Sequence, residues 1–413
     1  MTNKRKIIND PVYGFLTIED DLIFDLISHP FFQRQRRIKQ LGFSFLVYPG
    51  AMHTRFSHML GALNLMNRAL DVLRTKGVEI TPEECVAARV AILLHDIGHG
   101  PFSHISENLL VDVCHETLTE LYMERLNHQG NLDMALQIFR DTYPKHFLHQ
   151  LVSSQLDMDR LDYLSRDSFF TGVSEGIVGT ERIINMLNVG HSEEGRDELV
   201  VDEKGIYSVE KFIISRRLMY WQVYLHKTVI AADSLLLSLL RRARQLMAEG
   251  SLATPQQIES WPLLQFLSHF YTEEDFRHNP ELLDLFAAID DDDIMVALKR
   301  WQHHPDLILS TLAEHLLNRH LNAIRISNHP FSIDEIEQIR QQVQERLGIS
   351  PQESEYFVGT GMLKNHAYNF NDQEIRVLYK DGSCRDISEA SDQLDRHFLE
   401  KQVTKYYVFS PKQ

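Results

Sequence analysis

The sequence predicts a mainly α-helical fold that ends in a small α+β element. Apolar residues recur at helical spacing, some of them after helix-capping sequences, over most of the chain as far as about residue 345. Beyond about residue 350 the spacing changes to alternation, which is typical of strands. A chain of 413 residues with 43% hydrophobic content is long enough to bury a substantial core, and its length suggests two or three domains.

The first two helices are expected around residues 56–70 and 82–97. In the first, Phe56, Leu60 and Leu63 begin a helical apolar pattern that continues to residue 70. The second starts at Thr81-Pro82-Glu83-Glu84, which is a capping box with proline at the first helical position. Its apolar face then extends to Ile97.

A third and longer helix is expected from near Ser208 to Leu239 or beyond, and residues 250–345 are expected to continue as helices with short polar breaks. The run Asp290 to Asp293 has the composition of a metal cluster. Carboxylates in a first helical turn are, however, favoured by the helix dipole. The run is therefore predicted to be the N-terminal turn of the next helix.

The C-terminal part is expected to form a small α+β subdomain over residues 341–413, after a helical domain over residues 1–340. Alternating apolar residues predict strands at 375–379 and 403–409, and Asp381-Gly382 is a turn signal. The stretch 388–400 between these strands has a helical pattern.

The formal net charge of −16 at pH 7 argues against a general nucleic-acid coat protein, because phosphate neutralisation needs a basic face. It leaves room for a small anionic substrate in a local basic pocket. Cys85, Cys114 and Cys384 are widely spaced, so neither a disulfide framework nor a thiolate zinc site is indicated. No signal region and no apolar run of roughly 18 residues is present, so a cytoplasmic protein without membrane contact is expected.

The segment 94–104, which reads LHDIGHGPFSH, concentrates ionisable residues at the end of an apolar helix. Gly98, Gly100 and Pro101 make the chain turn there. Buried histidines and an aspartate are costly without a partner, and a divalent metal is the natural one. Nitrogen and carboxylate ligands suit Mn, Fe, Co, Ni or Zn rather than Ca, and they do not choose among these metals.

Further ligands must come from elsewhere in the chain. Candidates are His58 and an aspartate of the stretch 157–162. On a helix Asp159, Tyr163 and Asp167 share one face, four residues apart, and therefore point into one cleft. Each residue alone would be interpreted as a surface acid or a hydrogen-bonded core histidine. Together they indicate a metal centre, because buried ionisable groups cluster mainly where they function.

The order His, His-Asp, Asp resembles the HD-domain metal-dependent phosphohydrolases. The resemblance extends to the deoxynucleoside triphosphate triphosphohydrolases (dGTPase-like), in particular the branch of the SAM- and HD-domain enzyme and its bacterial relatives, and a SAM module is not expected. It covers about residues 5–240, with the core motifs within 40–240, and it rests on an ordered set of motifs. These are Asn9-Asp10-Pro11, Phe32-Gln33-Arg34, Lys39-Gln40-Leu41-Gly42, Pro49-Gly50-Ala51, Arg55-Phe56-x-His58, the segment 95–104, Asp159-Arg160-Leu161-Asp162-Tyr163, Arg166-Asp167 and Tyr224-x-His226-Lys227.

The resemblance implies a role for each matching position. The implied metal ligands are His58, His95, Asp96 and Asp159. The implied catalytic residues are His104, held beside the scissile phosphate, with His99, His115 and Glu107 near it. The implied substrate-binding residues are Gln40, Leu41, Arg55, Arg160, Tyr163, Asp167, Arg216, Tyr224, His226 and Lys227. Glu107 replaces an aspartate of the relatives, and Arg160 replaces a lysine, which keeps the charge but changes the hydrogen-bond geometry.

The implied activity is metal-dependent hydrolysis of a dNTP, dGTP-like, to a deoxynucleoside and inorganic triphosphate. His104, if protonated, could donate to the departing 5′ oxygen. Tyr163 and Asp167, packed against Leu41, could bind a 3′-OH and leave no room for a 2′-OH. One divalent transition metal is expected, with Mg²⁺ accompanying the nucleotide as a further expectation.

Regulation and assembly are also implied. Lys6, Asn9 and Arg36 match positions for an activating nucleotide, although the basic segment 34–39 is equally well interpreted as a solvated helix face. Ser28 replaces the aspartate that reads guanine in the mammalian relative, which puts activation by a guanine nucleotide in doubt. A homo-oligomer, dimer or tetramer, is expected, and binding of single-stranded nucleic acid stays open.

Two alternatives remain. One is an HD phosphohydrolase that acts on another nucleotide, such as (p)ppGpp or a nucleoside monophosphate. The alarmone hydrolases usually carry a Glu-Asp pair further along the helix after His-Asp, where this chain turns at Gly98-His99-Gly100-Pro101. The other alternative is a non-catalytic HD scaffold that senses nucleotides.

Overall fold

Most of the chain is helical, as the sequence predicts. The structure is a computed structural model that describes residues 6–107, 109–191, 195–365, 368–369, 374–394, 396–400 and 402–412, without the side chains of His104 and Phe398. The helices are α1 (Asp21–Ser28), α2 (Pro30–Gln33), α3 (Arg55–Thr75), α4 (Pro82–Leu94), α5 (His115–Leu126), α6 (Asp133–Phe139), α7 (His146–Val152), α8 (Met158–Thr171), α9 (Thr180–Met186), α10 (Ile206–Met219), α11 (Lys227–Ala248), α12 (Pro255–Ser260), α13 (Pro262–Ser268), α14 (Glu273–His278), α15 (Glu281–Ala287), α16 (Asp291–Trp301), α17 (Leu307–Leu317), α18 (Ile333–Leu347), α19 (Pro351–Ser354), α20 (Ile387–Ala390) and α21 (Arg396–Glu400).

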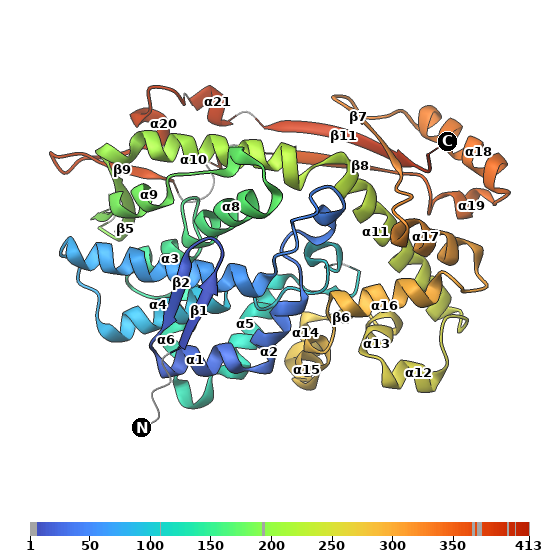
Figure 1. Ribbon diagram of the computed structural model, residues 1–413, viewed down its shortest axis with the longest axis horizontal. Helices are drawn as coiled ribbons and strands as arrows, with labels where there is room; N and C mark the ends of the chain where they lie inside the picture. The colour runs from blue at the N-terminus through green and yellow to red at the C-terminus, as the bar shows by residue number, and fades with distance from the viewer. Residues whose placement is uncertain are drawn as a thin grey trace.

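The strands are short and form four small sheets in the described part of the chain. They are β1 (Lys6–Asp10), β2 (Gly14–Ile18), β3 (Val111–Asp112), β4 (Leu187–His191), β5 (Asp197–Asp202), β6 (Tyr271–Thr272), β7 (Ala323–Ser327), β8 (Gly359–Asn365), β9 (Arg376–Leu378), β10 (Cys384–Asp386) and β11 (Val403–Ser410). Figure 1 shows the β1–β2 hairpin in front of α3, and β11 with β8 along the upper edge of the molecule in this view.

The core that supports the site is built by α3, α4 and α8. Helix α3 packs against both of the others and is buried along most of its length. Gly61 allows the close approach of α3 to α8, because a Cβ there would lie 2.0 Å from Asp162 Oδ1 and 2.2 Å from Arg166 Nη2. The predicted capping box at Thr81 and Glu84 is present at the start of α4. The two sequence motifs that contain His58 and Asp159 are thereby held side by side.

The expected single helix from Ser208 to Leu239 is wrong, because the chain bends in its middle. Helix α10 ends in a π-helical turn at Tyr220–Tyr224, and α11 starts afresh at Lys227. The two helical stretches meet at an angle of 56°. His226 starts the second helix by accepting the backbone N–H of Thr228 at its Nδ1 atom, 3.2 Å away.

The C-terminal segment forms strands and short helices, as expected, and its strands join earlier parts of the chain. Strand β11 pairs antiparallel with β8 and with β7, and β9 pairs parallel with β5. Strand β7 corrects the expectation of continuous helix up to residue 345: its alternating AIRIS sequence forms a sheet edge. The acidic run is a helix start, as predicted, with Asp290 as N-cap and Asp293 completing a capping box.

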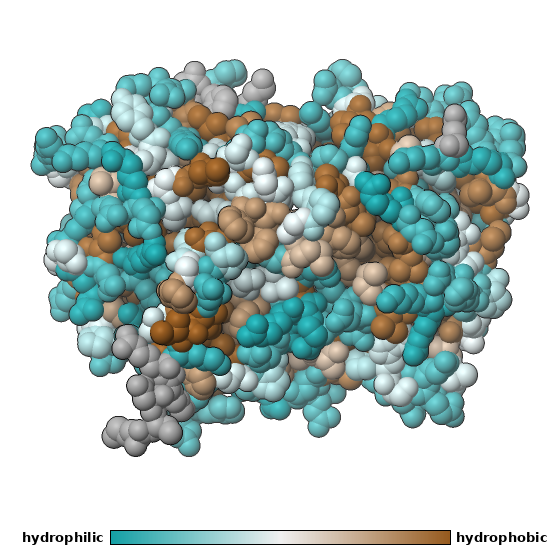
Figure 2. Space-filling model, viewed as in Figure 1, coloured by the Kyte–Doolittle hydropathy of each residue, from teal (hydrophilic) through white to brown (hydrophobic). Residues whose placement is uncertain are grey.

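The surface view shows where apolar side chains gather. Figure 2 shows hydrophobic side chains over the β1–β2 hairpin and the adjoining part of α1. In the hairpin, Ile7 and Phe15 are 62% and 77% exposed. In the described part of the chain no single helix has both the length and the apolar character to span a membrane. Only the bent pair of helices at 203–224 and 227–248, taken together, meets those criteria.

Candidate metal centre and nucleotide cavity

The segment 95–104, which contains the His95-Asp96 pair, starts where α4 ends, and Gly98 determines how closely it packs against α5. His95 is the C-cap of α4. A Cβ on Gly98 would lie 2.2 Å from the carbonyl oxygen of His115 and 2.4 Å from the amide nitrogen of Thr119, so only glycine fits against α5. The Thr119 hydroxyl accepts the Gly98 N–H at 3.0 Å and donates to the carbonyl of His95 at 3.1 Å. The turn that presents the histidines is thus fastened to α5.

Four side chains from three helices converge at this turn. His58 Nε2 lies 3.1 Å from Asp159 Oδ1 and 3.7 Å from Asp96 Oδ2. His95 Nε2 lies 3.5 Å from Asp159 Oδ1 and 3.6 Å from Asp96 Oδ1. Ligand atoms of His58, His95 and Asp96 all lie within 4.8 Å of one another. The four residues named as metal ligands from the sequence are therefore brought together.

The donor atoms fit a divalent transition metal. The buried Nε2 atoms of His58 and His95 have no hydrogen-bond partner within the described residues. Two imidazole nitrogens and two carboxylates form a mixed donor set that suits such an ion. Buried nitrogens that face carboxylates without hydrogen bonds are a cost that a bound cation removes. The group can therefore hold a metal.

A series of buried charged side chains on the Nδ1 side of His58 fixes the orientation of its ring. Its Nδ1 lies 2.7 Å from Asp162 Oδ2. Asp162 also accepts hydrogen bonds from Arg166, at 3.0 and 3.1 Å, and Arg166 reaches Asp10 at 2.7 Å. A carboxylate behind a ligand histidine fixes the tautomer and the ring orientation. This arrangement turns Nε2 of His58 toward the proposed ligands.

The charges at this centre are strongly coupled. Burial opposes protonation of His58, but the close carboxylates of Asp159 and Asp162 outweigh it and raise the pKa of His58 to about 10. Burial likewise opposes ionisation of Asp159, yet His58 and His95 hold the pKa of that carboxyl well below its usual range. Without a metal, the site carries a proton on His58 between ionised carboxylates.

A second group of ionisable side chains lies next to the first. The rings of His99 and His115 stack with centroids 3.8 Å apart, and His115 Nδ1 lies 2.9 Å from Glu107 Oε1. His99 Nε2 lies 3.5 Å from Asp96 Oδ1. Burial lowers the pKa of His99, whereas contact with Glu107 outweighs burial and raises the pKa of His115. The side chain of His104, the fourth catalytic candidate, lies outside the described residues.

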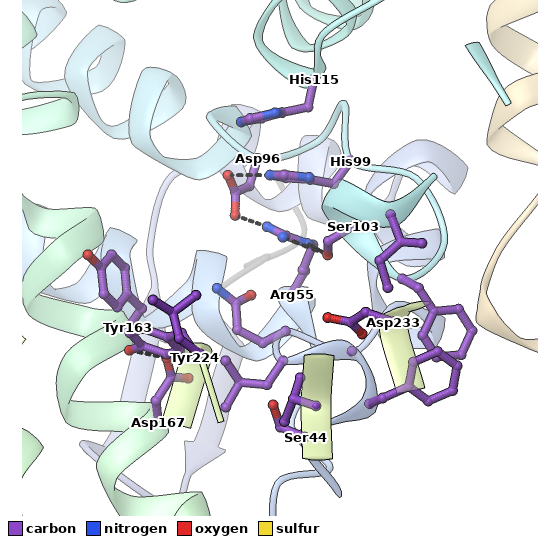
Figure 3. Close-up of a pocket in the computed structure, with 18 of the residues that line it drawn as sticks. Ser44, Arg55, Asp96, His99, Ser103, His115, Tyr163, Asp167, Tyr224 and Asp233 are labelled. Carbon is purple, nitrogen blue, oxygen red and sulfur yellow. Dashed lines mark hydrogen bonds and ion pairs between the residues drawn. The ribbon is translucent and has the colours of Figure 1, made fainter. Parts of the chain in front are cut away.

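Arg55 joins the metal group to the next loop. Its guanidinium is buried, pairs with Asp96 and donates to the hydroxyl of Ser103 from Nη2 at 2.7 Å. Figure 3 shows Arg55 between Asp96 and Ser103 at the cavity wall. Phe102 and Ser103 have positive φ angles of 51° and 52°. Asp291 holds this unusual turn, because its Oδ1 accepts the Phe102 N–H at 2.8 Å.

A cavity of about 450 Å³ opens beside the metal group. The face predicted from α8 is confirmed, since Asp159, Tyr163 and Asp167 all line this cavity. One carboxylate oxygen of Asp167 lies 2.7 Å from Nε2 of His53, and the other accepts the hydroxyl of Tyr224 at 2.8 Å. Candidates from the sequence that line the cavity are Gln40, Leu41, Arg55, Asp96, His99, His115, Asp159, Tyr163, Asp167 and Tyr224.

A smaller cavity of about 270 Å³ adjoins the first and shares Tyr220 with it. It is lined by the cationic side chains Arg160, Arg216 and Lys364. Arg160 is oriented by Asp157, whose Oδ2 accepts its Nε at 3.1 Å. Lys364 comes from β8 in the C-terminal segment, a contribution that the sequence pattern does not reveal.

The remaining candidates lie elsewhere. His226 caps α11 and Lys227 is exposed at its start, because of the bend after Tyr224; neither lines the two cavities. Lys6 and Asn9 are exposed on β1, and exposed Arg36 lies over the ring of Phe56, 3.5 Å from its centroid. None of these three lines the large cavity.

The basic segment 34–39 differs from an exposed helix face. Residues Arg34–Arg37 form a short 3-10 turn, and Arg34 is fully buried. Arg34 donates to the carbonyls of His99, at 2.9 Å, and Ile289, at 2.7 Å. It therefore supports the backbone of the HD turn.

Besides Lys364, three residues at the candidate site were given no role of their own from the sequence: Asp162, His53 and Asp233. Asp162 lies beside Asp159 in the recognised motif, and its helical position, three residues further, could have suggested a supporting role. His53 and Asp233 carry no local signal, because His53 precedes α3 and Asp233 lies within an apolar helix. Only the tertiary structure places them at the cavity.

Comparisons with known proteins agree with this geometry. The HD domain model matches residues 55–167, and the HD associated region model matches residues 178–279. Uncharacterized protein YwfO of Bacillus subtilis is 35% identical over 329 residues, which are 77% of this chain and 71% of that protein. A deoxynucleoside triphosphate triphosphohydrolase SAMHD1 homolog of Dictyostelium discoideum is 31% identical over 244 residues, 54% of this chain and 46% of that protein.

Among solved structures, a crystal structure of a phosphohydrolase from Bacteroides thetaiotaomicron superposes with a TM-score of 0.92. It is 48% identical and covers 99% of this chain and 100% of that chain. A hypothetical protein from Aquifex aeolicus, 26% identical, superposes with a TM-score of 0.71 and covers 98% of this chain and 96% of that chain. The chain therefore belongs to the HD-domain family of metal-dependent phosphohydrolases.

Proposed function

We propose that this protein is a dNTP triphosphohydrolase that releases a deoxynucleoside and inorganic triphosphate. One observation carries the proposal. The side chains that can hold a metal, a cavity of nucleotide size and an adjoining cationic cavity lie next to one another. A nucleoside triphosphate needs a cationic space for its charged tail, a cavity for its sugar and base, and a metal near the bond to be broken. The SAMHD1 relatives support the substrate class, although less than half of their length is matched.

The metal would be held by His58, His95, Asp96 and Asp159, and the donor set leaves Mn, Fe, Co, Ni and Zn as candidates. When bound, a divalent ion supplies Lewis acidity at a phosphoryl group and toward water. Asp162 keeps the His58 ring in place during this chemistry. Mg²⁺ is proposed to accompany the nucleotide.

The triphosphate is proposed to extend toward the smaller cavity. Arg160, Arg216 and Lys364 line that space, and Nε of Arg216 is buried without a hydrogen-bond partner within the described residues. Phosphate oxygens are natural acceptors for such guanidinium donors. Arg55 faces the larger cavity from the metal side and could neutralise charge near the scissile bond. His226 and Lys227 line neither cavity, and their contact with the substrate stays a prediction.

The sugar is proposed to contact Tyr163 and Asp167, with Gln40 and Leu41 on the same wall. Both oxygens of Asp167 already have donors, His53 and Tyr224, which fix the carboxylate in place. A rigid, filled subsite rejects an added 2′-OH through sterics and unpaired polar groups. This supports a deoxynucleotide rather than a ribonucleotide.

The departing 5′ oxygen needs a proton, and the histidines beside the metal group are proposed to supply it. The pKa of His115 is raised, because its contact with Glu107 outweighs the opposing effect of burial, and this favours the protonated imidazole. The stacked His99 connects it to Asp96. His104 is the proposed direct donor, with His99, His115 and Glu107 supporting its protonation and position.

The N-terminal hairpin bears on assembly and regulation. The exposed apolar side chains of Ile7 and Phe15 on the β1–β2 hairpin support a homo-oligomer. Lys6, Asn9 and Arg36 lie around this hairpin and α3, where an activating nucleotide would bind at the protein surface. A cytoplasmic location is likewise proposed.

Product analysis tests the function directly. The purified chain is loaded with Mn²⁺ and offered each dNTP alone and then all four together, and the products are identified by phosphorus NMR. Triphosphate and a deoxynucleoside are the expected products. Orthophosphate or pyrophosphate would contradict the triphosphohydrolase assignment while leaving an HD phosphohydrolase. Turnover in the mixture alone would show that a second nucleotide activates the enzyme.

A further inference from the structure

Asp233 is a carboxylate in the wall of the large cavity that the proposed chemistry does not use. It lies in α11, which begins after the bend and brings this residue to the cavity. Within the described residues, its side chain has neither a hydrogen-bond partner nor an ion-pair partner. Burial alone raises the pKa of Asp233 to about 7. Asp233 is half-buried, and a carboxylate that is partly withdrawn from water without a partner is costly, so a ligand that supplies hydrogen-bond donors would lower this cost.

The cavity has three chemically different sides. Figure 3 shows Asp96, His99 and His115 on one side, Tyr163, Asp167 and Tyr224 on a second, and Asp233 across the cavity from that second group. The first side is the metal and histidine group, and the second is the proposed sugar subsite. The third side, which contains Asp233, therefore remains for the nucleobase of a bound nucleotide.

The surroundings of Asp233 suit an aromatic ring. Phe43 and Phe102 line the same cavity and stack on each other, with centroids 4.2 Å apart and planes inclined by 19°. Val229, one helical turn before Asp233, and Leu225 also line it. An apolar surface with one convergent polar group is the usual composition of a site that binds a flat ligand and reads one of its edges.

We propose that Asp233 is the specificity-determining residue for the base and that it selects guanine, so that dGTP is the preferred substrate. This inference rests on the proposed dNTP hydrolysis. In its ionised form, which two neighbouring donors of a ligand stabilise, the carboxylate is a pure acceptor with two oxygens. Guanine places two donors next to each other on its Watson–Crick edge, the N1–H and the 2-amino group, and can bind both oxygens at once.

The other bases do not match this acceptor pair. Adenine and cytosine each place a ring-nitrogen acceptor beside their amino group, and thymine places its single N–H between two carbonyl oxygens. Each therefore turns a lone pair toward the carboxylate when one donor is bound. A buried polar group that is left unpaired or faces a like charge discriminates strongly between substrates.

The test compares Asp233→Asn with the unmodified full chain loaded with Mn²⁺. The values of kcat/KM are measured for dGTP, dITP, dATP, dCTP and dTTP. dITP is the sharpest probe, because it differs from dGTP only by the missing 2-amino group. The unmodified chain is expected to prefer dGTP over dITP by about tenfold, the value of one hydrogen bond to a charged group. In Asp233→Asn this ratio is expected to fall toward one.

A matched control is Glu249→Gln, which makes the same chemical change at the exposed C-terminal end of the same helix. It should leave every ratio unchanged. Equilibrium binding of dGTP, dITP and dCTP to the metal-free chain, measured by calorimetry, provides a readout that does not depend on turnover. The guanine preference is expected there too, and to disappear in Asp233→Asn.

The outcomes separate the two proposals. Absence of triphosphate release, together with a guanine preference in binding that Asp233→Asn removes, rejects the proposed hydrolysis and keeps the guanine site. Hydrolysis of all dNTPs with equal kcat/KM overturns the role of Asp233 and keeps the hydrolysis. A dGTP preference that persists undiminished in Asp233→Asn also overturns it.

Discussion

Nδ1 of His58 lies 2.7 Å from Oδ2 of Asp162, and this contact turns the opposite nitrogen of the ring toward Asp96 and Asp159. Asp162 is itself fixed by Arg166, which continues to Asp10 at the end of β1. The N-terminal hairpin, α3 and α8 are therefore linked through buried charges that end at the proposed metal centre. The position of one metal ligand depends on residues that never touch the metal.

We expect Asp162→Asn to weaken metal binding by roughly 10- to 100-fold, the usual effect of losing the partner of a ligand histidine. The amide can donate to Nδ1, which favours the tautomer with a proton on Nε2, and that nitrogen then has no lone pair for a metal. Competition with a chelator measures the affinity, and thermal melting checks the fold. Asp202→Asn, at the partly exposed ion pair with Lys76, is the control. Equal affinities would remove Asp162 from the metal centre.

Removing a proposed ligand should be more severe. Asp159→Ala removes the carboxylate that lies close to both His58 and His95. We expect bound metal and turnover to disappear together, as measured by elemental analysis and product release. A variant that retains stoichiometric metal and full activity would show that the ligand assignment is wrong.

Metal uptake should release protons at neutral pH. The pKa of His58 in the folded, metal-free chain is about 10, above its ordinary value of about 6.5. The charged form therefore stabilises the metal-free protein fully below about pH 6.5, and this contribution is lost as the pH rises through about 10. A metal needs the neutral imidazole, so its affinity should increase with pH over that window.

Calorimetric titration with Zn²⁺ at pH 7, in two buffers of different ionisation enthalpy, gives the number of protons released. We expect at least one per ion, since the pKa of His95 is also raised, through Asp96 and Asp159 and against the effect of burial. A binding enthalpy that is the same in both buffers would mean that no proton is displaced.

Gly61 should tolerate no side chain. A Cβ at this position would lie 2.0 Å from Asp162 Oδ1, and neither α3 nor the buried Asp162–Arg166 pair has room to shift. We expect Gly61→Ala to lower the free energy of unfolding by about 1–3 kcal/mol or more, the range for overpacked cores. Gly179→Ala is the control, because the nearest atom to its Cβ, Cβ of Arg182, is 3.8 Å away. Urea denaturation that gives equal losses for both variants would contradict the close packing.

The helices and the metal group could be predicted because their signals are local. The capping box at Thr81, the acidic start of α16 and the four-residue spacing of Asp159, Tyr163 and Asp167 each depend on a few neighbouring residues. The assignment of His58 to the same metal group as His95 and Asp96 rests on the order of the motifs along the chain. The spacing within any one motif does not predict it.

What could not be predicted depends on tertiary contacts. The bend at Leu225 and His226 interrupts an apolar pattern that continues on both sides, and only a π turn and a histidine cap mark it. Arg34 is in a basic run in the sequence, yet it is buried beneath the HD turn. Lys364 reaches the cationic cavity from a strand that pairs with β11, nearly 150 residues beyond Arg216.

Asp167→Asn should separate sugar recognition from metal binding. Asp167 lies two helical turns beyond Asp159 on α8, and its carboxylate oxygens accept hydrogen bonds from His53 and Tyr224, so the metal group is not touched. An amide presents one acceptor and one donor in place of two acceptors, and it must lose one of these partners and loosen the subsite. We expect unchanged metal content and a preference for dNTP over NTP that falls about tenfold, equivalent to ~1.4 kcal/mol. The control is Glu181→Gln, since Glu181 is exposed and pairs with Arg68. It should leave the ratio of kcat/KM for dGTP to that for GTP unchanged. If Asp167→Asn also leaves that ratio intact, the cavity wall formed by α8 does not contact the sugar, and the nucleotide must lie in another orientation.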